Sequence, residues 1–451
     1  MAPPRRAPNL RLRALLAEAG WSQDVLARKV NSLAALRGLR TRYDRTSVAH
    51  WLTGSLPRPP VPELIREAFS ERLGRTVTAL DTGMPEAGGL SEFWAVPTLG
   101  DPVARLAMMA AAELDPVHRA EARALGYNAG AVLPPGPRED PGKVVAEGPP
   151  TLPAHAIRQL ARLYVFHIEA FGGGHASSGL AAHLAGSVPQ WLRWGGSDRR
   201  VLFRGAAQLT HLLALSVADM GAEGQAQGYH LAAARLAVEV EDRAMYALSV
   251  RALSTQALRT GRVELAERLA RSAFAAAPPD ASPALHAYLE AQLAVTHART
   301  RRRETALTAL AAAEQSIGRA EDADGKGPFD RYPLADFSYQ QAMALSALGE
   351  RRPALRALHT SLRHRGPTRP RSRALTRARI AEVYLAQGDL ETAGAHWYTV
   401  VEEAARLDSQ QVQSRLAHMR RELHPYRRSR IVSALLARDA ELAATRTEPR
   451  G

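Results

Sequence analysis

The chain repeats one helical pattern along most of its length, and this repetition constrains the fold more than any other feature. From about residue 154 to residue 445, every periodic segment is alanine-rich and carries its apolar residues at helical spacing. A helix with a single apolar face cannot bury that face alone, so consecutive helices must stack to form a continuous core. The sequence therefore predicts an all-α solenoid of helical hairpins over 154–445, with a concave side that is the default binding site.

Glycine marks most of the turns between the two helices of each predicted hairpin. The turns fall at Gly221, Gly261, Arg301, Gly349 and Gly388, which are 40, 40, 48 and 39 residues apart. This pattern resembles the tetratricopeptide repeat, in which a glycine joins two antiparallel helices and alanines let them approach closely, although that repeat is about 34 residues long. The resemblance implies a unit that binds a peptide, a small ligand or a protein. A scaffold or a dimerisation platform is the alternative.

The first 80 residues are more basic than the rest of the chain. They hold 14 Lys and Arg against 6 Asp and Glu, a surplus of +8 within a net charge of +14. A concentrated basic segment favours a polyanionic partner, because each neutralised phosphate releases counterions. Four short amphipathic helices are predicted here. The first ends at Gly20 and the second is capped by Ser22. The third is capped by Thr46 or Ser47 and ends at Gly54, before a proline cluster and a fourth helix.

Two segments of this region resemble a known DNA-binding motif. "SQDVLARKV" (22–30), followed after a long basic connector (31–45) by "TSVAHWLTG" (46–54), is similar to the helix-turn-helix of the Cro and lambda-repressor (Xre) class. The resemblance implies that the second segment is a recognition helix that enters the major groove of DNA. Leu52 stands where the class usually has an acidic residue, and the connector is enlarged. The DNA contacts implied by the resemblance and by the local charge are Gln23, Arg42, Arg45, Thr46, Ser47, His50 and Arg58.

The enlarged connector also resembles segments of large regulators of antibiotic production and differentiation in high-GC filamentous bacteria. The resemblance implies a sequence-specific transcriptional regulator, with control of secondary metabolism or differentiation as its role. Double-stranded DNA is then the main partner, a homodimer is the expected assembly, and a peptide or protein ligand is expected in the groove of the solenoid. The alternative from a different class is a protein-interaction scaffold whose basic N-terminal bundle docks a partner without binding DNA.

Composition divides the chain into three predicted parts. Two stretches rich in proline and glycine, 81–100 and 133–153, carry no sustained periodicity and are predicted connectors. We therefore expect a helix-turn-helix domain over 1–80, a linker with one or two helices over 81–153, and the helical-repeat domain over 154–445.

A second basic stretch lies inside the repeat region. Between Glu350 and Glu382 there is no acidic residue, but there are ten arginines. One interpretation is a solvated basic loop that joins two hairpins. The other is an anion-binding site or a second DNA contact, because guanidinium groups bind phosphates and carboxylates in bidentate pairs. The candidate residues for the second interpretation are Arg369, Arg371 and Arg373.

No pattern in the chain points to catalysis. The segment "FGGGHASSG" (171–179) lacks the lysine and Ser/Thr of a phosphate-binding loop and is predicted to be a hairpin turn. Its neighbouring histidines lack the spacing of two zinc ligands on one helix, and the sequence has no cysteine. We expect no enzyme activity, metal or cofactor. Charged residues interrupt the N-terminal apolar stretch, and no uncharged apolar run approaches the ~18 residues of a membrane span, so a cytoplasmic protein is expected.

Overall fold

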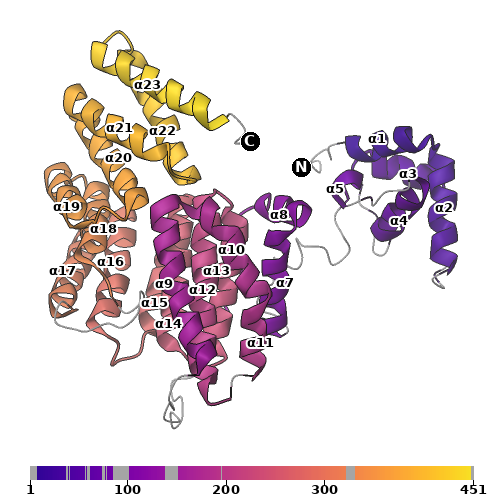
Figure 1. Cartoon of the computed structure of the whole chain (residues 1–451), viewed down its shortest axis with the longest axis horizontal. Coiled ribbons are helices and arrows are strands. Elements are labelled where there is room, and N and C mark those ends of the chain that lie inside the picture. The colour runs from indigo at the N-terminus through magenta and orange to yellow at the C-terminus, as the bar shows by residue number, and fades with distance from the viewer. Residues whose placement is uncertain are drawn as a thin grey trace. The chain divides into compact units, whose positions relative to one another are not determined.

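A computed structural model describes the conformation of most of the chain. The described residues are 8–36, 39, 41–55, 57, 61–73, 77, 79–84, 101–137, 151–194, 196–320 and 331–447. Over these residues every regular element is a helix, which confirms the predicted all-α class (Figure 1). The chain divides into two compact units, Met1–Ala95 and Val96–Gly451.

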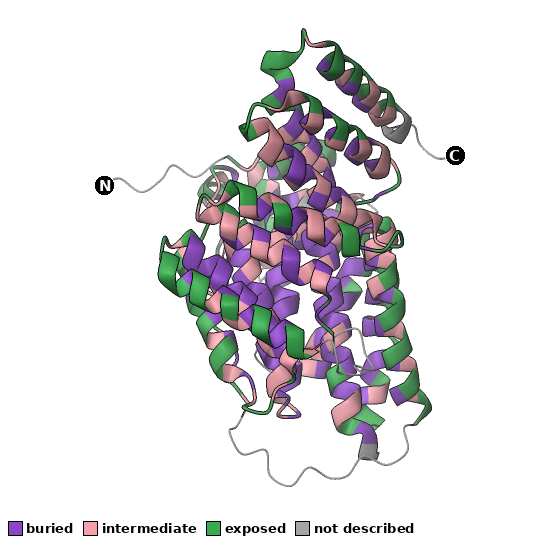
Figure 2. Cartoon of the chain, turned by 90° about the vertical axis from the view of Figure 1, so that its left-hand side faces the viewer, coloured by how far each residue is buried: buried purple, intermediate pink, exposed green. Residues whose placement is uncertain are grey.

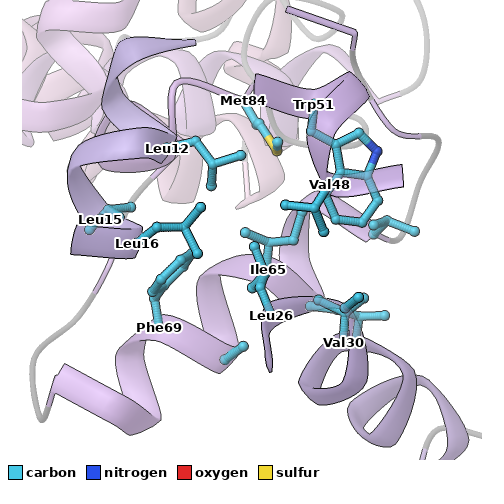
Figure 3. Packing of buried hydrophobic residues seen from close by; sticks show 14 of the residues in the cluster. Leu12, Leu15, Leu16, Leu26, Val30, Val48, Trp51, Ile65, Phe69 and Met84 are labelled. Atoms are coloured by element: carbon cyan, nitrogen blue, oxygen red, sulfur yellow. The ribbon is translucent and has the colours of Figure 1, made fainter. Parts of the chain in front are cut away.

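The N-terminal unit is a bundle of short helices around one apolar core. Its helices are α1 (Leu10–Ala19), α2 (Gln23–Leu36), α3 (Arg45–Leu52), α4 (Val61–Leu73) and α5 (Ala79–Thr82). The first four each contribute apolar side chains with no solvent exposure, among them Leu12, Leu26, Val48 and Phe69 (Figure 3). Full burial of such a side chain contributes about 1.5–3 kcal/mol. Burial of its apolar face in this core therefore holds the short α3 in place.

The second helix is longer than the sequence predicted, and the basic connector is correspondingly shorter. The connector was expected to begin at residue 31, but α2 continues to Leu36. Asn31, within α2, holds the far end of the connector through two interactions with Tyr43: its Nδ2 donates to the carbonyl (2.8 Å), and its Oδ1 accepts from the N–H (3.0 Å). The Asn31 Oδ1 also accepts from the Thr41 hydroxyl (2.9 Å). These contacts fix the path of the chain into α3.

The second unit is a series of helical hairpins. Its helices are α7 (Pro102–Leu114), α8 (Pro116–Arg123), α9 (Leu152–Phe171), α10 (Gly173–Ala185), α11 (Ser187–Trp194), η1 (Gly196–Asp198), α12 (Arg199–Asp219), α13 (Glu223–Val238), α14 (Arg243–Arg259), α15 (Val263–Ala276), α16 (Pro283–Arg299), α17 (Arg303–Ala320), α18 (Leu334–Ala347), α19 (Arg351–His364), α20 (Pro370–Ala386), α21 (Leu390–Ala404), α22 (Gln410–Leu423), η2 (His424–Tyr426) and α23 (Arg430–Thr447).

These helices pack as consecutive pairs. The most extensive contacts join α12 to α13, α14 to α15, α16 to α17, α18 to α19, and α20 to α21, and each pair also packs against the next (Figure 1). Buried residues lie between the helices, while exposed residues lie on the outer faces (Figure 2). The predicted solenoid of helical hairpins is confirmed.

The segment predicted as a linker contributes two helices to this unit. α7 packs against α10 and α13, and α8 packs against α13. The buried Glu113 carboxylate accepts hydrogen bonds from Gln225 (2.7 Å) and Arg123 (3.0 Å). The Tyr229 hydroxyl donates to the Met109 carbonyl (2.8 Å), across 120 positions of sequence. Two helices thus lie within 81–153, where one or two were expected, and both pack against helices of the second unit. Composition could not reveal these helices as part of the core, because their partners are distant in sequence.

Among the described helices, α12 alone is long and apolar enough to cross a membrane by length and composition. In the structure, 78% of its most apolar window is buried inside the unit. Such burial is typical of the core helix of a packed domain.

All five predicted hairpin turns are present, and each has a left-handed backbone. The φ angle is +82° at Gly221, +77° at Gly261, +62° at Arg301, +83° at Gly349 and +83° at Gly388. The N–H after each turn residue returns to the carbonyl five positions earlier, for example from Arg262 to Ala257 (2.8 Å). This hydrogen bond is the mark of a Schellman helix end, which favours glycine because a Cβ is disfavoured at positive φ.

Arg301 offers a test of this backbone explanation. A side chain in the left-handed region costs about 1–2 kcal/mol, and glycine loses part of that advantage through its greater freedom when unfolded. The variant R301G should therefore increase the free energy of unfolding by a net ~1 kcal/mol or less and raise the thermal unfolding midpoint. The reverse change at the equivalent turn, G261R, should lower it. Circular dichroism melts should give shifts of opposite sign, and shifts of the same sign would contradict the explanation.

The C-terminal hairpins fold back onto the beginning of the second unit. Asp219, at the end of α12, is fully buried, and its carboxylate accepts two hydrogen bonds from the Arg371 guanidinium (2.7 and 2.9 Å). It also accepts from the Ser409 hydroxyl (2.8 Å) and the Gly173 N–H (2.9 Å). Burial lowers the pKa of Arg371, but the Asp219 and Glu169 carboxylates outweigh burial, and the pKa is raised. One carboxylate thus ties α10, α12, α20 and the start of α22 together.

The glycine-rich segment 171–179 contacts Asp408, next to the Ser409 that binds Asp219. It contains the turn between α9 and α10, as predicted. The Asp408 N–H donates to the Phe171 carbonyl (2.7 Å), and the Gly174 N–H donates to the Asp408 carbonyl (3.0 Å). A Cβ on Gly172 would lie 2.3 Å from the Asp408 carbonyl oxygen, so a larger residue could not occupy this position without displacing the backbone. The glycines therefore serve close packing of two distant segments.

The variant D219N should destabilise the second unit strongly. It leaves Arg371 buried without its main counter-ion, and breaking a buried ion pair from one side costs about 3–5 kcal/mol. Urea unfolding followed by circular dichroism measures the loss. The matched control is D280N, at an exposed aspartate between α15 and α16. Equal stability of D219N and D280N would contradict the role assigned to the Asp219 carboxylate.

Candidate nucleic-acid interface

The first turn of α3 is capped by an aspartate. The Asp44 carboxylate accepts from the Ser47 N–H and from the Ser47 hydroxyl, both at 2.8 Å, and the Asp44 N–H donates to the Ser47 hydroxyl (3.4 Å). Hydrogen bonds from the backbone and side chain of Ser47 lower the pKa of Asp44. The predicted caps, Thr46 and Ser47, are therefore corrected: the cap is Asp44, at least two residues earlier, and its side chain accepts from the Ser47 N–H of the first turn.

One side of α3 is buried and the other is exposed. Val48 and Trp51 lie in the core (Figure 3), as does Leu52. The Tyr43 ring packs edge-on against Trp51, with ring centroids 5.3 Å apart. The opposite side exposes Arg45, Thr46, His50 and Thr53. α3 ends at Leu52, with Thr53 as its C-cap, and the next residue, Gly54, has φ +95°. The result is a two-turn helix with a free polar face.

The structure separates the predicted DNA contacts into groups. Arg42, Arg45, Thr46 and His50 are exposed on α3 or directly before it. Gln23 is the first residue of α2 and is partly buried, after Ser22, whose hydroxyl accepts from the Val25 N–H as a cap (3.3 Å). Ser47 is partly buried and its hydroxyl is bound to Asp44, so it is not free to contact a base. Arg58 lies outside the described residues.

Two exposed residues were not in the predicted set. Thr53 lies three positions after His50 and seven after Thr46, so helical spacing places it on the same face. Arg28 is exposed on α2, at the centre of a polar row formed with Asp24 and Ser32. Periodicity alone could have identified both residues.

Part of the basic surplus of this unit is unpaired. Lys29 forms an ion pair with Glu71 (2.7 Å), and the Arg72 Nε donates to the Ala19 carbonyl (3.1 Å). In the described part of the unit, no ion pair is formed by the exposed Arg13, Arg28, Arg42 and Arg45. Exposed guanidinium groups without a carboxylate are the charges that a polyanion would neutralise.

The arginine-rich stretch of the second unit is mostly neutralised by its own chain. Arg365 and Arg369 bind the Asp336 carboxylate (2.7 and 3.4 Å), and Arg371 binds Asp219. Arg373 donates to the Arg365 carbonyl (2.9 Å) and lies 3.9 Å from a carboxylate oxygen of Glu403. The prediction of an anion or second DNA contact at Arg369, Arg371 and Arg373 stays a prediction, which must account for these partners within the chain. These guanidinium groups already form ion pairs with acidic residues that are distant in sequence.

The beginning of that stretch forms an exposed basic groove. Its volume is ≈ 660 Å³, and its lining residues are Arg351, Arg352, Leu355, Arg356, His359 and Gln387. The three arginines are exposed. Burial, followed by the nearby Arg363 charge, lowers the pKa of His359. The groove is therefore basic through its arginines, while its histidine favours the neutral form.

The cap of α3 can be tested by substitution. The variant D44A removes both hydrogen bonds to Ser47 and should lower the melting midpoint of the N-terminal unit by about 5 °C. Because the folded-state pKa of Asp44 is lowered, the stabilisation should be complete above the ordinary value of 3.8 and disappear as the pH falls through the lowered value. D24A, at an exposed first-turn aspartate of α2, is the control. A midpoint for D44A no lower than that for D24A would contradict the assignment.

Comparison with known proteins gives one family match and a distant structural likeness. Residues 12–85 match the model described as the SP15 N-terminal domain, within the N-terminal unit. No curated protein matches the chain. A chain in "Crystal structure of APC/C hetero-tetramer Cut9-Hcn1" is similar over 63% of this chain and 46% of that chain, with 18% identity and a TM-score of 0.33. The chain thus spans less than half the length of that structure, and a likeness this distant carries no argument about function.

Proposed function

We propose that the protein is a sequence-specific DNA-binding transcriptional regulator whose N-terminal unit inserts α3 into the major groove. One observation carries the proposal: a two-turn helix is held from one side by buried apolar residues and presents Arg45, Thr46 and His50 on the other. The major groove is about 12 Å wide and admits one helix, which reads bases mainly through its N-terminal residues. The resemblance to the Xre class supports the same assignment.

Charge supports a nucleic-acid partner. The +8 surplus of residues 1–80 includes exposed guanidinium groups beside α3, at Arg42 and Arg45. Phosphate contacts of this kind position a protein on the duplex and make its affinity fall steeply with salt. Base contacts from Thr46 and His50 would then supply the sequence preference.

The helical-repeat unit would provide assembly and regulation. Stacked hairpins present an extended surface suited to a peptide, small-ligand or protein partner. In a homodimer, two copies of α3 would meet half-sites about one helical turn apart, and a ligand of the hairpins would alter that spacing. This arrangement resembles regulators of Gram-positive bacteria that join a helix-turn-helix to tetratricopeptide repeats. The proposed protein is cytoplasmic and has no catalytic role.

One observation favours a second candidate, a protein-interaction scaffold. The Asp44 carboxylate lies at the leading edge of α3 and occupies the Ser47 hydroxyl. A negative charge at this edge repels phosphate but suits a basic protein surface. Salt-dependent, sequence-selective binding to duplexes separates a DNA reader from such a scaffold.

The test begins with selection of fragments of genomic DNA by the full-length protein. Fluorescence anisotropy on an enriched duplex then compares variants. T46A and H50A should each weaken specific binding by about 10-fold, because a good base contact is worth 1–3 kcal/mol, and should leave the salt slope unchanged. R45A, if Arg45 contacts a phosphate, should reduce the slope by about 1.

The matched control is R268A, at an exposed arginine of α15. It should bind like the unaltered protein. Absence of an enriched sequence, or no binding to duplexes at low ionic strength, would contradict regulation through DNA and favour the scaffold.

A further inference from the structure

Arg251, on α14, is a buried cation with two guanidinium nitrogens that have no hydrogen-bond partner among the described residues. Its residue exposure is 5%, and no carboxylate among the described residues forms an ion pair with it. Its Nη1 donates to the Tyr288 hydroxyl (2.9 Å) and the Thr255 hydroxyl (3.2 Å). Its Nε and Nη2 are buried and have no hydrogen-bond partner in the described part of the chain. Burying a charge is unfavourable unless it is paired and hydrogen-bonded, so this arrangement calls for an explanation.

The edge formed by Nε and Nη2 is the one that this chain uses elsewhere to hold carboxylates. Arg259, on the same helix, binds Glu223 through Nε (3.0 Å) and Nη2 (3.1 Å). Arg438 binds Glu402 through the same two nitrogens, at 2.6 and 3.2 Å. These two donors form a fork that matches the two oxygens of a carboxylate or phosphate. Arg251 presents this fork with no acceptor among the described residues.

The surroundings of Arg251 supply another unpaired donor and hold the guanidinium in place. Its Cζ lies 3.8 Å from the centre of the Tyr288 ring, and Tyr332 packs edge-on against that ring at 5.1 Å. The Tyr332 hydroxyl is also buried without a hydrogen-bond partner among the described residues. Thr255 donates in turn to the Gln292 side chain (3.2 Å), so the network continues from α14 into α16.

The local charge is positive. Burial raises the pKa of Tyr332, and the charges that act on this hydroxyl come from Arg251, Arg365 and Asp336. The two oxygens of Asp336 are already bound by Arg365 and Arg369. Among the described residues, the one carboxylate that acts on this hydroxyl is therefore already engaged by two other arginines, while Tyr288, which covers the guanidinium, is itself partly exposed.

We propose that Arg251, with Tyr332, binds the oxyanion of a ligand, a carboxylate or a phosphate, between α14, α16 and the start of α18. Tyr288 covers the guanidinium in the absence of ligand and moves aside when the oxyanion occupies the Nε and Nη2 fork. This inference rests on the proposed ligand-binding role of the helical-repeat unit. It adds that such a ligand must have a carboxylate or phosphate group.

The experiment uses the full chain without DNA, so its outcome is independent of whether α3 reads bases. Melting midpoints and calorimetric titrations are measured with two probes at constant ionic strength. One is inorganic phosphate, and the other is N-acetyl-tetraalanine with a free carboxylate, compared with its C-terminal amide. We expect one probe to raise the midpoint of the unaltered protein, and the identity of that probe shows which oxyanion is bound.

Substitutions show whether Arg251 binds a ligand or only stabilises the fold. R251M should abolish the response without lowering the midpoint in the absence of ligand, because an apolar side chain of similar size replaces an unpaired charge. R251K keeps the charge but loses the fork, and should weaken binding by about 10-fold or more. Y332F should weaken binding as well. R259M, which breaks a formed carboxylate pair on the same helix, should lower the midpoint and keep the response.

Three results would overturn the proposal. The first is a response of R251M equal to that of the unaltered protein. The second is no response of the unaltered protein to either oxyanion. The third is a fall in the ligand-free midpoint of R251M as large as that of R259M, which would identify Arg251 as a structural cation.

Discussion

The packing of the C-terminal hairpins of the second unit against α10 and α12 depends on the hydrogen bonds that the buried Asp219 carboxylate accepts. Stacked hairpins are otherwise held by contacts between neighbours, so the two ends of such a series are free to move apart. Asp219 removes that freedom because it binds Arg371, Ser409 and Gly173 at once. The glycines of the α9–α10 turn let the backbone at Asp408 come close enough for these bonds to form. Charge and close packing therefore act at the same junction.

Arginine has different roles in this chain, and the surroundings of each guanidinium decide which role it has. Arg371 and Arg365 are bound by carboxylates of the same chain and contribute to structure. Arg42 and Arg45 are exposed beside α3 and remain available to a polyanion. Arg251 is buried, and its Nε and Nη2 have no hydrogen-bond partner in the described part of the chain. The functional proposals follow from the last two situations, because a charge that its own protein does not neutralise is the one that an external partner can bind.

Local signals predicted much of the fold. The turn residues were identifiable, including Arg301, because the apolar period on both sides left only one place for the chain to reverse. The buried side of α3 was identifiable for the same reason, since Val48, Trp51 and Leu52 follow helical spacing. Prediction failed where contacts with residues distant in sequence decide the path of a connector or the packing of a helix. Asn31 lies in α2 and ties Tyr43 to it, and α7 and α8 pack against helices about a hundred residues away.

The sequence by itself determined the helical class, the hairpin turns, the basic character of the first 80 residues and the polar face of α3. The basic character follows from composition alone, and the others depend on the spacing of residue types along a few turns of helix, which is a local property. Only the tertiary structure decided which arginines are neutralised, that the Ser47 hydroxyl is hydrogen-bonded to Asp44, and that no described carboxylate pairs with Arg251. The physical reason is that the interaction energy of a charged group depends on its burial and on the partners that folding brings close to it. Neither can be read from the separation of residues along the sequence.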